Sequence, residues 1–338
     1  MNNVESTKKL SEIMMMPLAA KSLSTLAELG VADLLKEVPL DIATIANACN
    51  ADKTILLNMF KIVELFGFFS INPNDVIENN TGSDLLTSDH PQSMRHFCML
   101  FGEEYYRGYE GLRHTCQTGQ SGFKNVYNQT LYQYLDNTPD RASVYDLAMR
   151  DFSRPVGTLL ARTFPEVFNQ AKSVIDIGGG SGVISTELVK QYQHLTACIF
   201  DREDVCQRSA KSIPAELKTR IQTYSGDFFK HIPEGYDIYL LKNVLHNWNE
   251  PSCGEILNNI AQSLENGRLL IIEPLVEREE SSPRLLFNAL FQSVICEDGT
   301  YQRSLSSLET LFSQSGLKMV QTNKLATGHT VIELSKIQ

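Results

Sequence analysis

Near the middle of a chain of 338 residues, positions 174–182 read Val174-Ile175-Asp176-Ile177-Gly178-Gly179-Gly180-Ser181-Gly182. An apolar strand here runs into four glycines within five residues, and a segment with apolar residues at helical spacing, 183–192, follows. Glycine lets the backbone turn sharply and lets a ligand lie against bare peptide. The stretch therefore predicts a strand, a tight turn and a helix, with a ligand at the turn.

Short runs rich in apolar and β-branched residues alternate with segments of helical period around this turn. Such an order is typical of a parallel sheet with right-handed crossovers. Two final runs, separated by a turn at Thr327-Gly328, predict an antiparallel pair at the sheet edge. We therefore expect an α/β fold for this half. The predicted strands are 173–177, 196–200, 236–241, 268–272, 317–324 and 329–335, and the predicted helices are 183–192, 205–212 and 253–264.

The first hundred residues predict a helix, a turn, a second helix and a small hairpin, the order of a winged helix. Asp41 is a candidate cap for the first of these helices. DNA binding is one interpretation of this pattern, and a packing or dimerisation module is the other. This region has seven Lys and Arg residues and twelve Asp and Glu residues, so we expect it to bind a phosphate backbone weakly. The packing or dimerisation module is therefore the favoured interpretation.

Overall charge, hydropathy and cysteine content narrow the function classes. Acidic residues outnumber basic ones 40 to 30, for a net charge of −10, which argues against nucleic acid as the main partner. The seven cysteines are scattered without a CxxC pair, so we expect no disulfide framework, no zinc site and a cytoplasmic setting. No run approaches the roughly 18 apolar residues that span a bilayer, so we expect no membrane partner.

Aromatic residues are dense between positions 91 and 165, where the chain has helical spacing. Such residues fit a buried core as well as the wall of an apolar ligand pocket, and the sequence leaves both interpretations open.

Carboxylates after the glycine turn point to a nucleoside ligand. Asp201 follows the next predicted strand, 23 residues after Gly178, where a carboxylate grips ribose hydroxyls. Nicotinamide sites prefer GxGxxG, whereas the glycines here are spaced GxGxG and follow Asp176. Further along, Asp227-Phe228 offers a carboxylate and a ring that can bond and stack on adenine.

His246 is the best candidate for a general base. It follows the strand predicted at 236–241, at the edge where open α/β sheets place their chemistry. Glu273 ends the next predicted strand and can accept a hydrogen bond from the imidazole ring. Such a bond would fix the tautomer and stabilise the imidazolium.

Taken together, these segments resemble the metal-independent small-molecule O-methyltransferases that use S-adenosylmethionine, the family of the caffeate, flavonoid and hydroxyindole O-methyltransferases. The resemblance covers nearly the whole chain. Its motifs are DIGGGSG at 176–182, FD at 200–201, GDFF at 226–229, LKNVLHNW at 241–248 and IIEP at 271–274.

The resemblance implies a Rossmann-like domain with a mostly parallel seven-stranded sheet, an antiparallel edge hairpin and a winged-helix-like N-terminal domain. It also implies three regions: a dimerisation domain at 1–100, a helical linker contributing to the substrate pocket at 101–165, and a catalytic domain at 166–338. It further implies a homodimer, a small aromatic acceptor, and S-adenosylhomocysteine as product.

Site roles follow from the same resemblance. His246 would be the base and Glu273 its partner, with no metal. The acceptor side would include Met149, a methionine that sandwiches the aromatic acceptor. The cofactor would be held by Asp176, Gly178, Gly180, Asp201, Arg202, Asp227, Phe228 and Lys242, and the acceptor by Met149, Phe152, Asn247, Phe291 and Gln302.

Three positions depart from the family pattern. Asn247 follows the histidine where Asp is common, Gln302 stands near the place of a second carboxylate, and Arg202 replaces an apolar residue. The alternative function is a non-methylating one, in which the protein binds S-adenosylmethionine but catalyses a decarboxylation, hydroxylation or pericyclic step. An intact His246–Glu273 pair argues against it.

Overall fold

The computed structural model describes residues 2–276 and 283–337 and divides into two compact units, Met1–Tyr106 and Arg107–Gln338. Residues 107–165 pack within the second unit, so the boundary lies six residues beyond the expected end of the N-terminal domain. No helix among the described residues has the length and apolar content needed to cross a bilayer.

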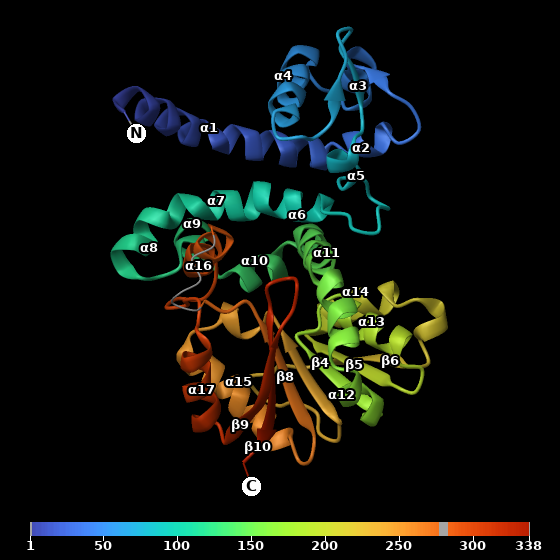
Figure 1. Cartoon of the computed structure of the whole chain (residues 1–338), viewed down its shortest axis with the longest axis vertical. Helices are drawn as coiled ribbons and strands as arrows, with labels where there is room; N and C mark the ends of the chain where they lie inside the picture. The colour runs from blue at the N-terminus through green and yellow to red at the C-terminus, as the bar shows by residue number, and fades with distance from the viewer. Residues whose placement is uncertain (1, 277–282, 338) are drawn as a thin grey trace. The chain divides into compact units, whose positions relative to one another are not determined.

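The first unit contains the helix, turn, helix and hairpin of the winged-helix pattern (Figure 1). Asp41 begins the first of these helices, because its carboxylate accepts hydrogen bonds from the backbone N–H groups of Ala43 and Thr44. Three short strands pair antiparallel in the order β1-β3-β2. The elements are α1 (Asn3–Glu28), α2 (Val31–Leu34), β1 (Leu40–Asp41), α3 (Ile42–Ala48), α4 (Lys53–Glu64), β2 (Ser70–Ile71), β3 (Val76–Glu78), α5 (Thr81–Asp84), α6 (Arg95–Leu100) and a π-helical turn (Phe101–Tyr105).

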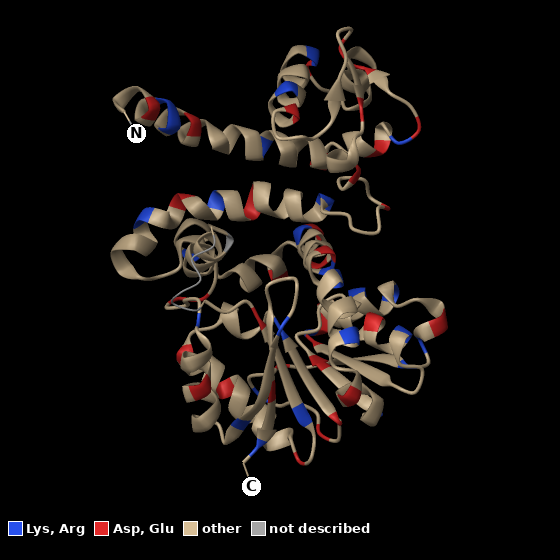
Figure 2. Ribbon diagram, viewed as in Figure 1, with Lys and Arg blue, Asp and Glu red and all other residues tan. Residues whose placement is uncertain are grey.

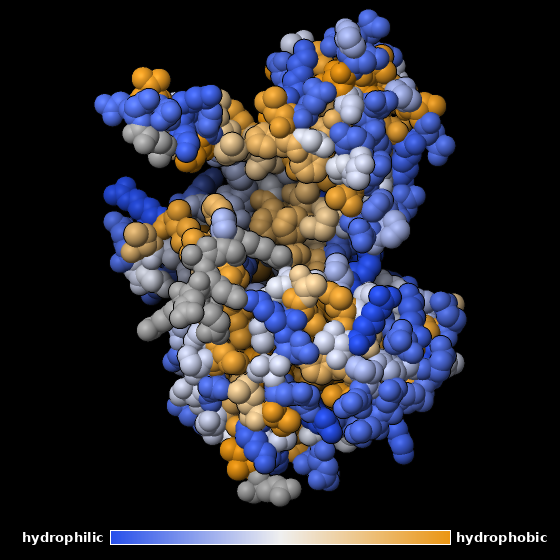
Figure 3. All heavy atoms as spheres, viewed as in Figure 1, coloured by the Kyte–Doolittle hydropathy of each residue, from blue (hydrophilic) through white to orange (hydrophobic). Residues whose placement is uncertain are grey.

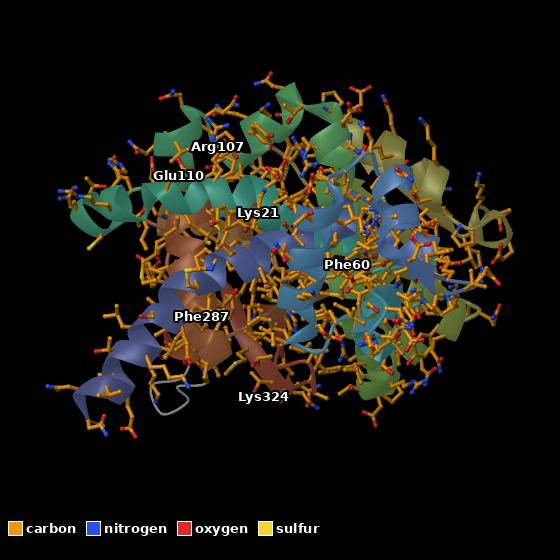
Figure 4. The ribbon with its side chains drawn as sticks, turned by 90° about the horizontal axis from the view of Figure 1, so that it is seen from above. Lys21, Phe60, Arg107, Glu110, Phe287 and Lys324 are labelled. Atoms are coloured by element: carbon orange, nitrogen blue, oxygen red, sulfur yellow. The ribbon has the colours of Figure 1, made fainter. Side chains whose placement is uncertain are left out.

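An apolar core holds this unit together. Phe60 of α4 is fully buried, and its ring meets Phe69 edge-on at a centroid distance of 5.0 Å (Phe60 is labelled in Figure 4). Along α4 and α3 the Lys and Arg residues are few (Figure 2). Lys53 and Lys61 are the only basic residues of α4, so this helix lacks the basic face that phosphate binding needs.

The second unit is built on a seven-stranded sheet in the order β6-β5-β4-β7-β8-β10-β9. The five strands from β6 to β8 are parallel, and β10 pairs antiparallel with both β8 and β9. This confirms the predicted α/β class and edge hairpin. The strands are β4 (Ser173–Ile177), β5 (Thr196–Asp201), β6 (Ile221–Ser225), β7 (Ile238–Lys242), β8 (Arg268–Glu273), β9 (Leu317–Lys324) and β10 (Thr330–Lys336).

Helices cover both faces of this sheet, because alternate strand residues point to opposite sides. Val174 joins one core with α11, α12 and α13, whereas Ile175 joins a second core with α15 and α17 (Figure 1). The helices are α7 (Tyr106–Gly108), α8 (Leu112–Thr118), α9 (Gly122–Tyr127), α10 (Leu131–Asn137), α11 (Pro139–Thr163), α12 (Pro165–Gln170), α13 (Val183–Gln191), α14 (Glu203–Ser212), α15 (Glu250–Ser263), α16 (Pro283–Ile295) and α17 (Leu305–Gln314), with 3-10 turns at Tyr109–Gly111, Ala215–Leu217 and Leu245–Asn247.

Candidate active site

A cavity of about 430 Å³ lies at the carboxyl ends of the parallel strands. Its wall contains the glycine turn after β4, the ends of β5 and β7, and side chains from α10 and α11. Adjacent parallel strands bring segments far apart in the sequence to this one edge, which is where open α/β sheets bind ligands.

The glycine turn needs its glycines for two different reasons. Gly178, Gly180 and Gly182 have φ angles of +68°, +53° and +71°, in the left-handed region that other residues avoid. A Cβ on Gly182 would also lie 2.2 Å from Cδ1 of Ile199, whereas one on Gly180 would meet nothing within 4 Å. The turn is therefore packed closely on one side and left open on the other.

Two carboxylates from neighbouring strands line this cavity beside the glycine turn. Asp176 is 2% exposed and accepts a hydrogen bond of 2.9 Å from Ser185, and burial raises its pKa to about 6. Asp201 accepts from the backbone N–H groups of Gly180 and Arg202 at 2.9 and 2.8 Å. Burial raises the pKa of Asp201 although these two donors oppose the shift. Both groups are placed to bind hydroxyls or positive charge.

Lys242 ends β7 inside the same cavity wall. Its ammonium group is buried, donates a hydrogen bond of 2.8 Å to Ser153 and lies 5.1 Å from the centre of the Phe152 ring. Burial lowers the pKa of Lys242 to about 7, although the charges of Glu273 and Asp176 oppose the shift. The lysine is therefore close to losing its proton at neutral pH.

Aromatic rings form another part of the cavity wall. Trp248 meets Phe228 and Phe229 edge-on at 5.9 and 4.8 Å, and stacks on Tyr132 at 5.5 Å. Asp227, beside these rings, accepts a hydrogen bond from the backbone N–H of Phe229 at 3.0 Å. Flat rings beside a carboxylate suit a heteroaromatic ligand that carries an amine.

His246 and Glu273 meet at the carboxyl edge of β7 and β8. Nδ1 of His246 donates a hydrogen bond of 2.6 Å to Oε2 of Glu273, and Oε1 of Glu273 accepts the backbone N–H of Leu245 at 2.9 Å. The carboxyl group is 3% exposed and the imidazole 19%. Nε2 has no hydrogen-bond partner among the described residues, so it is available to a ligand. The ring is not part of the 430 Å³ cavity wall, but Val244 and Asn247 on either side of it are.

The expected acceptor residues are only partly brought together. Met149 and Asn247 line the cavity, and Asn247 is held by a hydrogen bond of 3.0 Å from its side-chain amide to the carbonyl of Asn243. Phe152, Phe291 and Gln302 lie outside the cavity wall. Phe152 packs beside Lys242, and Gln302 donates to the carbonyl of Pro274 at 3.1 Å.

Arg202 lines the cavity but has a second set of contacts. Its guanidinium group pairs with Asp136 of α10 and lies 5.6 Å from the centre of the Tyr132 ring. Arg202 therefore lines the cavity at which a cofactor contact was expected, and it also links the end of β5 to α10.

Several cavity residues were given no individual site role from the sequence. Tyr132, Tyr145, Asp146 and Ser153 line the cavity, and all come from the aromatic-rich region before the sheet. Their density was the available signal. It could not separate the pocket wall from the core, because helical spacing alone does not say which face meets a ligand.

Comparison with known proteins agrees with this architecture. The chain is 28% identical to the phenazine O-methyltransferase PhzM of Lysobacter antibioticus, over 99% of each protein. The solved structure of the mitomycin 7-O-methyltransferase MmcR covers 98% of this chain, and 98% of its own, at a TM-score of 0.90 and 26% identity. Human N-acetylserotonin methyltransferase, solved in complex with S-adenosylmethionine, shares the fold at a TM-score of 0.89 and 23% identity, over all of both chains.

The family assignment rests on a direct match. A family model described as an O-methyltransferase domain matches residues 109–318, more than half of the chain and nearly all of the second unit. By this match the chain belongs to the S-adenosylmethionine-dependent O-methyltransferase family.

Proposed function

We propose that this enzyme transfers the methyl group of S-adenosylmethionine to a hydroxyl group of a small aromatic molecule, with His246 as general base. The observation that carries the proposal is the hydrogen bond of 2.6 Å between His246 and the buried Glu273, at the sheet edge that also holds the glycine-turn cavity. A general base needs a nitrogen that can accept the proton, and Nε2 has no hydrogen-bond partner among the described residues, while the adjacent residue Asn247 lines the cavity.

The cavity residues fit the cofactor by their chemistry. S-adenosylmethionine carries an ammonium group, a sulfonium, ribose hydroxyls and adenine. Asp176 and Asp201 supply carboxylates beside a turn whose open side at Gly180 admits a ligand. Asp227 and Phe228 supply an acceptor and a ring for adenine. Lys242, with its lowered pKa, would add a donor without a full positive charge.

When bound, the cofactor supplies an electrophilic methyl group. His246 would take the acceptor's proton at Nε2, which matters because a phenol has a pKa near 10 and stays largely protonated at neutral pH. Glu273 would hold the imidazole with Nδ1 protonated and stabilise the imidazolium that forms. General-base assistance of this kind is worth about 10²–10⁴-fold. Alignment of the reacting groups in the cavity supplies the rest.

The acceptor proposal rests on the cavity and the relatives. Rings and Met149 form much of the wall, which favours a flat aromatic acceptor. The relatives are named for phenazine, mitomycin and N-acetylserotonin. We propose a phenol or an aromatic polyketide as the acceptor, with Asn247 on the acceptor side.

The test is methyl transfer from labelled S-adenosylmethionine to a panel of phenols, with products identified by mass spectrometry. We expect a methyl ether as product and loss of most turnover in His246→Ala with cofactor binding retained. Near-normal turnover in His246→Ala would remove the base assignment. A decarboxylated or hydroxylated product would favour the alternative activity.

A homodimer formed through the N-terminal unit is also proposed. The first part of α1 exposes a run of apolar side chains, visible as orange groups on the N-terminal helix in Figure 3. Exposed apolar surface of this extent typically marks an interface. Light scattering should report a dimer for the wild type and a monomer for Ile13→Glu combined with Met14→Glu. The exposed residues are Leu10, Ile13, Met14, Met15, Met16 and Leu18.

A cytoplasmic setting is proposed from the cysteines, all seven of which are free. Unpaired thiols are the normal state in a reducing compartment.

A further inference from the structure

Helix α10 brings one aromatic ring to the cavity through contacts that the family roles do not explain. Tyr132, the second residue of α10, lines the cavity and stacks on Trp248 with ring centroids 5.5 Å apart and planes 17° from parallel. Because Trp248 also contacts Phe228, the Tyr132 ring extends the aromatic part of the cavity wall. A ligand in this cavity would therefore meet Tyr132 as one of the lining side chains.

The same helix is tied to the cofactor edge of the sheet by charge. Asp136, one turn after Tyr132, pairs with Arg202, which follows β5 directly after Asp201. The Arg202 guanidinium also lies 5.6 Å from the Tyr132 ring. The side chains of the Arg202–Asp136 ion pair are 33% and 52% exposed, so dissolved salt should weaken the attraction between them.

The boundary between α10 and α14 is hollow and polar. A second cavity of about 390 Å³ is lined there by Asp136, Glu203, Asp204 and Arg208, with only Leu135 and Pro139 as apolar residues. The link from α11 to α14 is also ionic, through Arg208 and Asp146 at 2.5 Å. The boundary of α10 with α14 is therefore held mainly by exposed ion pairs, each of little worth, whereas the buried Leu131 and Leu135 keep α10 attached to the rest of the unit.

We propose that α10 (Leu131–Asn137) is a flap that retains the cofactor: Tyr132 covers the cofactor cavity, and Asp136 positions Tyr132 by holding Arg202. This inference rests on the proposed function in one respect, that the ligand of the cavity is the nucleoside cofactor. Tyr132 touches the ligand, whereas Asp136 acts through Arg202. Opening the flap then limits the release of S-adenosylhomocysteine, and the release rate rises with ionic strength.

Trp248, the only tryptophan of the chain, provides the measurement. Stopped-flow fluorescence of Trp248 follows the displacement of S-adenosylhomocysteine by excess S-adenosylmethionine, with rates rather than amplitudes compared. For Asp136→Asn we expect release to be about two- to fivefold faster, as loss of a partly exposed ion pair implies. For Tyr132→Ala we expect a rise of about tenfold or more, and for Tyr132→Phe a rate close to wild type, because the ring is kept.

A second measurement isolates the ion pair. Raising NaCl from about 0.05 to about 0.5 M should speed release from the wild type more than from Asp136→Asn, which has no pair to screen. Lys124→Met is the matched control, because it breaks the similarly exposed pair of Lys124 with Asp298, which lines neither cavity. Its release rate and salt response should equal those of the wild type.

The outcomes separate the two proposals. Equal release rates and equal salt responses in wild type and Asp136→Asn would overturn the flap, as would a Tyr132→Ala variant that releases the ligand at the normal rate. Absence of S-adenosylhomocysteine binding to the wild type, measured by calorimetry, would overturn the cofactor assignment instead. Thermal melting of each variant verifies that the fold is intact.

Discussion

Replacing Glu273 with glutamine should slow methyl transfer only when His246 is present. The carboxylate of Glu273 is 3% exposed and accepts two donors, the Leu245 N–H at 2.9 Å and Nδ1 of His246 at 2.6 Å. Glutamine has the same shape but one acceptor oxygen and one N–H₂ group. If the amide oxygen keeps the Leu245 N–H, the N–H₂ group faces Nδ1, which must then accept and leaves the ring proton on Nε2; the negative charge that stabilises an imidazolium is also gone.

The expected size follows from the bond that is lost. A hydrogen bond to a charged group contributes about 1.5–3 kcal/mol. Each 1.36 kcal/mol in the barrier is a factor of ten in rate, so kcat should fall by about 10- to 100-fold. The KM for the acceptor should change little, because the interaction matters when the proton has moved to the ring. His246→Ala should cost about 10²–10⁴-fold.

The assay is a double-mutant cycle on kcat, with product measured by transfer of a labelled methyl group. Because Glu273 is expected to act through the imidazole, Glu273→Gln should add nothing in a His246→Ala background. Binding of S-adenosylhomocysteine and the melting temperature serve as controls, since a misfolded variant would lose both. An independent, multiplicative loss in the double variant would refute the positioning role of Glu273.

Three further predictions concern the cofactor cavity and its stability. Asp201→Asn should weaken binding of S-adenosylhomocysteine by about 10- to 100-fold in calorimetry, because a charged acceptor is lost beside the glycine turn; an unchanged affinity would contradict the ribose role. The pKa of Lys242 is about 7 in the folded protein, against 10.5 for an ordinary lysine. Between pH 7 and pH 10.5 the unfolded chain therefore binds a proton that the folded chain lacks, so the free energy of unfolding rises with pH. Lys242→Met should therefore raise the free energy of unfolding at pH 6, by up to about 5 kcal/mol, and much less at pH 10, as urea titrations would reveal. Gly182→Ala should destabilise the fold by about 2–4 kcal/mol, because backbone strain at φ +71° adds to a 2.2 Å contact of the new Cβ with Ile199. Gly180→Ala should cost only about 1 kcal/mol, because its Cβ would meet nothing within 4 Å. Equal losses of stability for the two variants in chemical denaturation would contradict this difference in packing.

The strands show how far local pattern reaches. The predicted ranges 173–177 and 317–324 match β4 and β9, and the other predicted strands differ by one or two residues at an end. β6 (Ile221–Ser225) was not predicted, because it is an edge strand whose burial is limited largely to Ile221. An edge strand with polar, exposed side chains carries no apolar run for sequence interpretation to detect.

Sequence alone determined the parallel sheet, the glycine turn and the placing of Asp201, His246 and Glu273 at strand ends. Each of these depends on residues a few positions apart, and parallel strands bring their carboxyl ends to one edge whatever the loops do. The position of Tyr132 in the cavity wall, and that of Asp136 beside Arg202 from 66 residues away, depend on long-range packing that no local pattern reveals. The lowered pKa of Lys242 likewise depends on the tertiary structure, because desolvation comes from every group packed around the amine rather than from its neighbours in sequence.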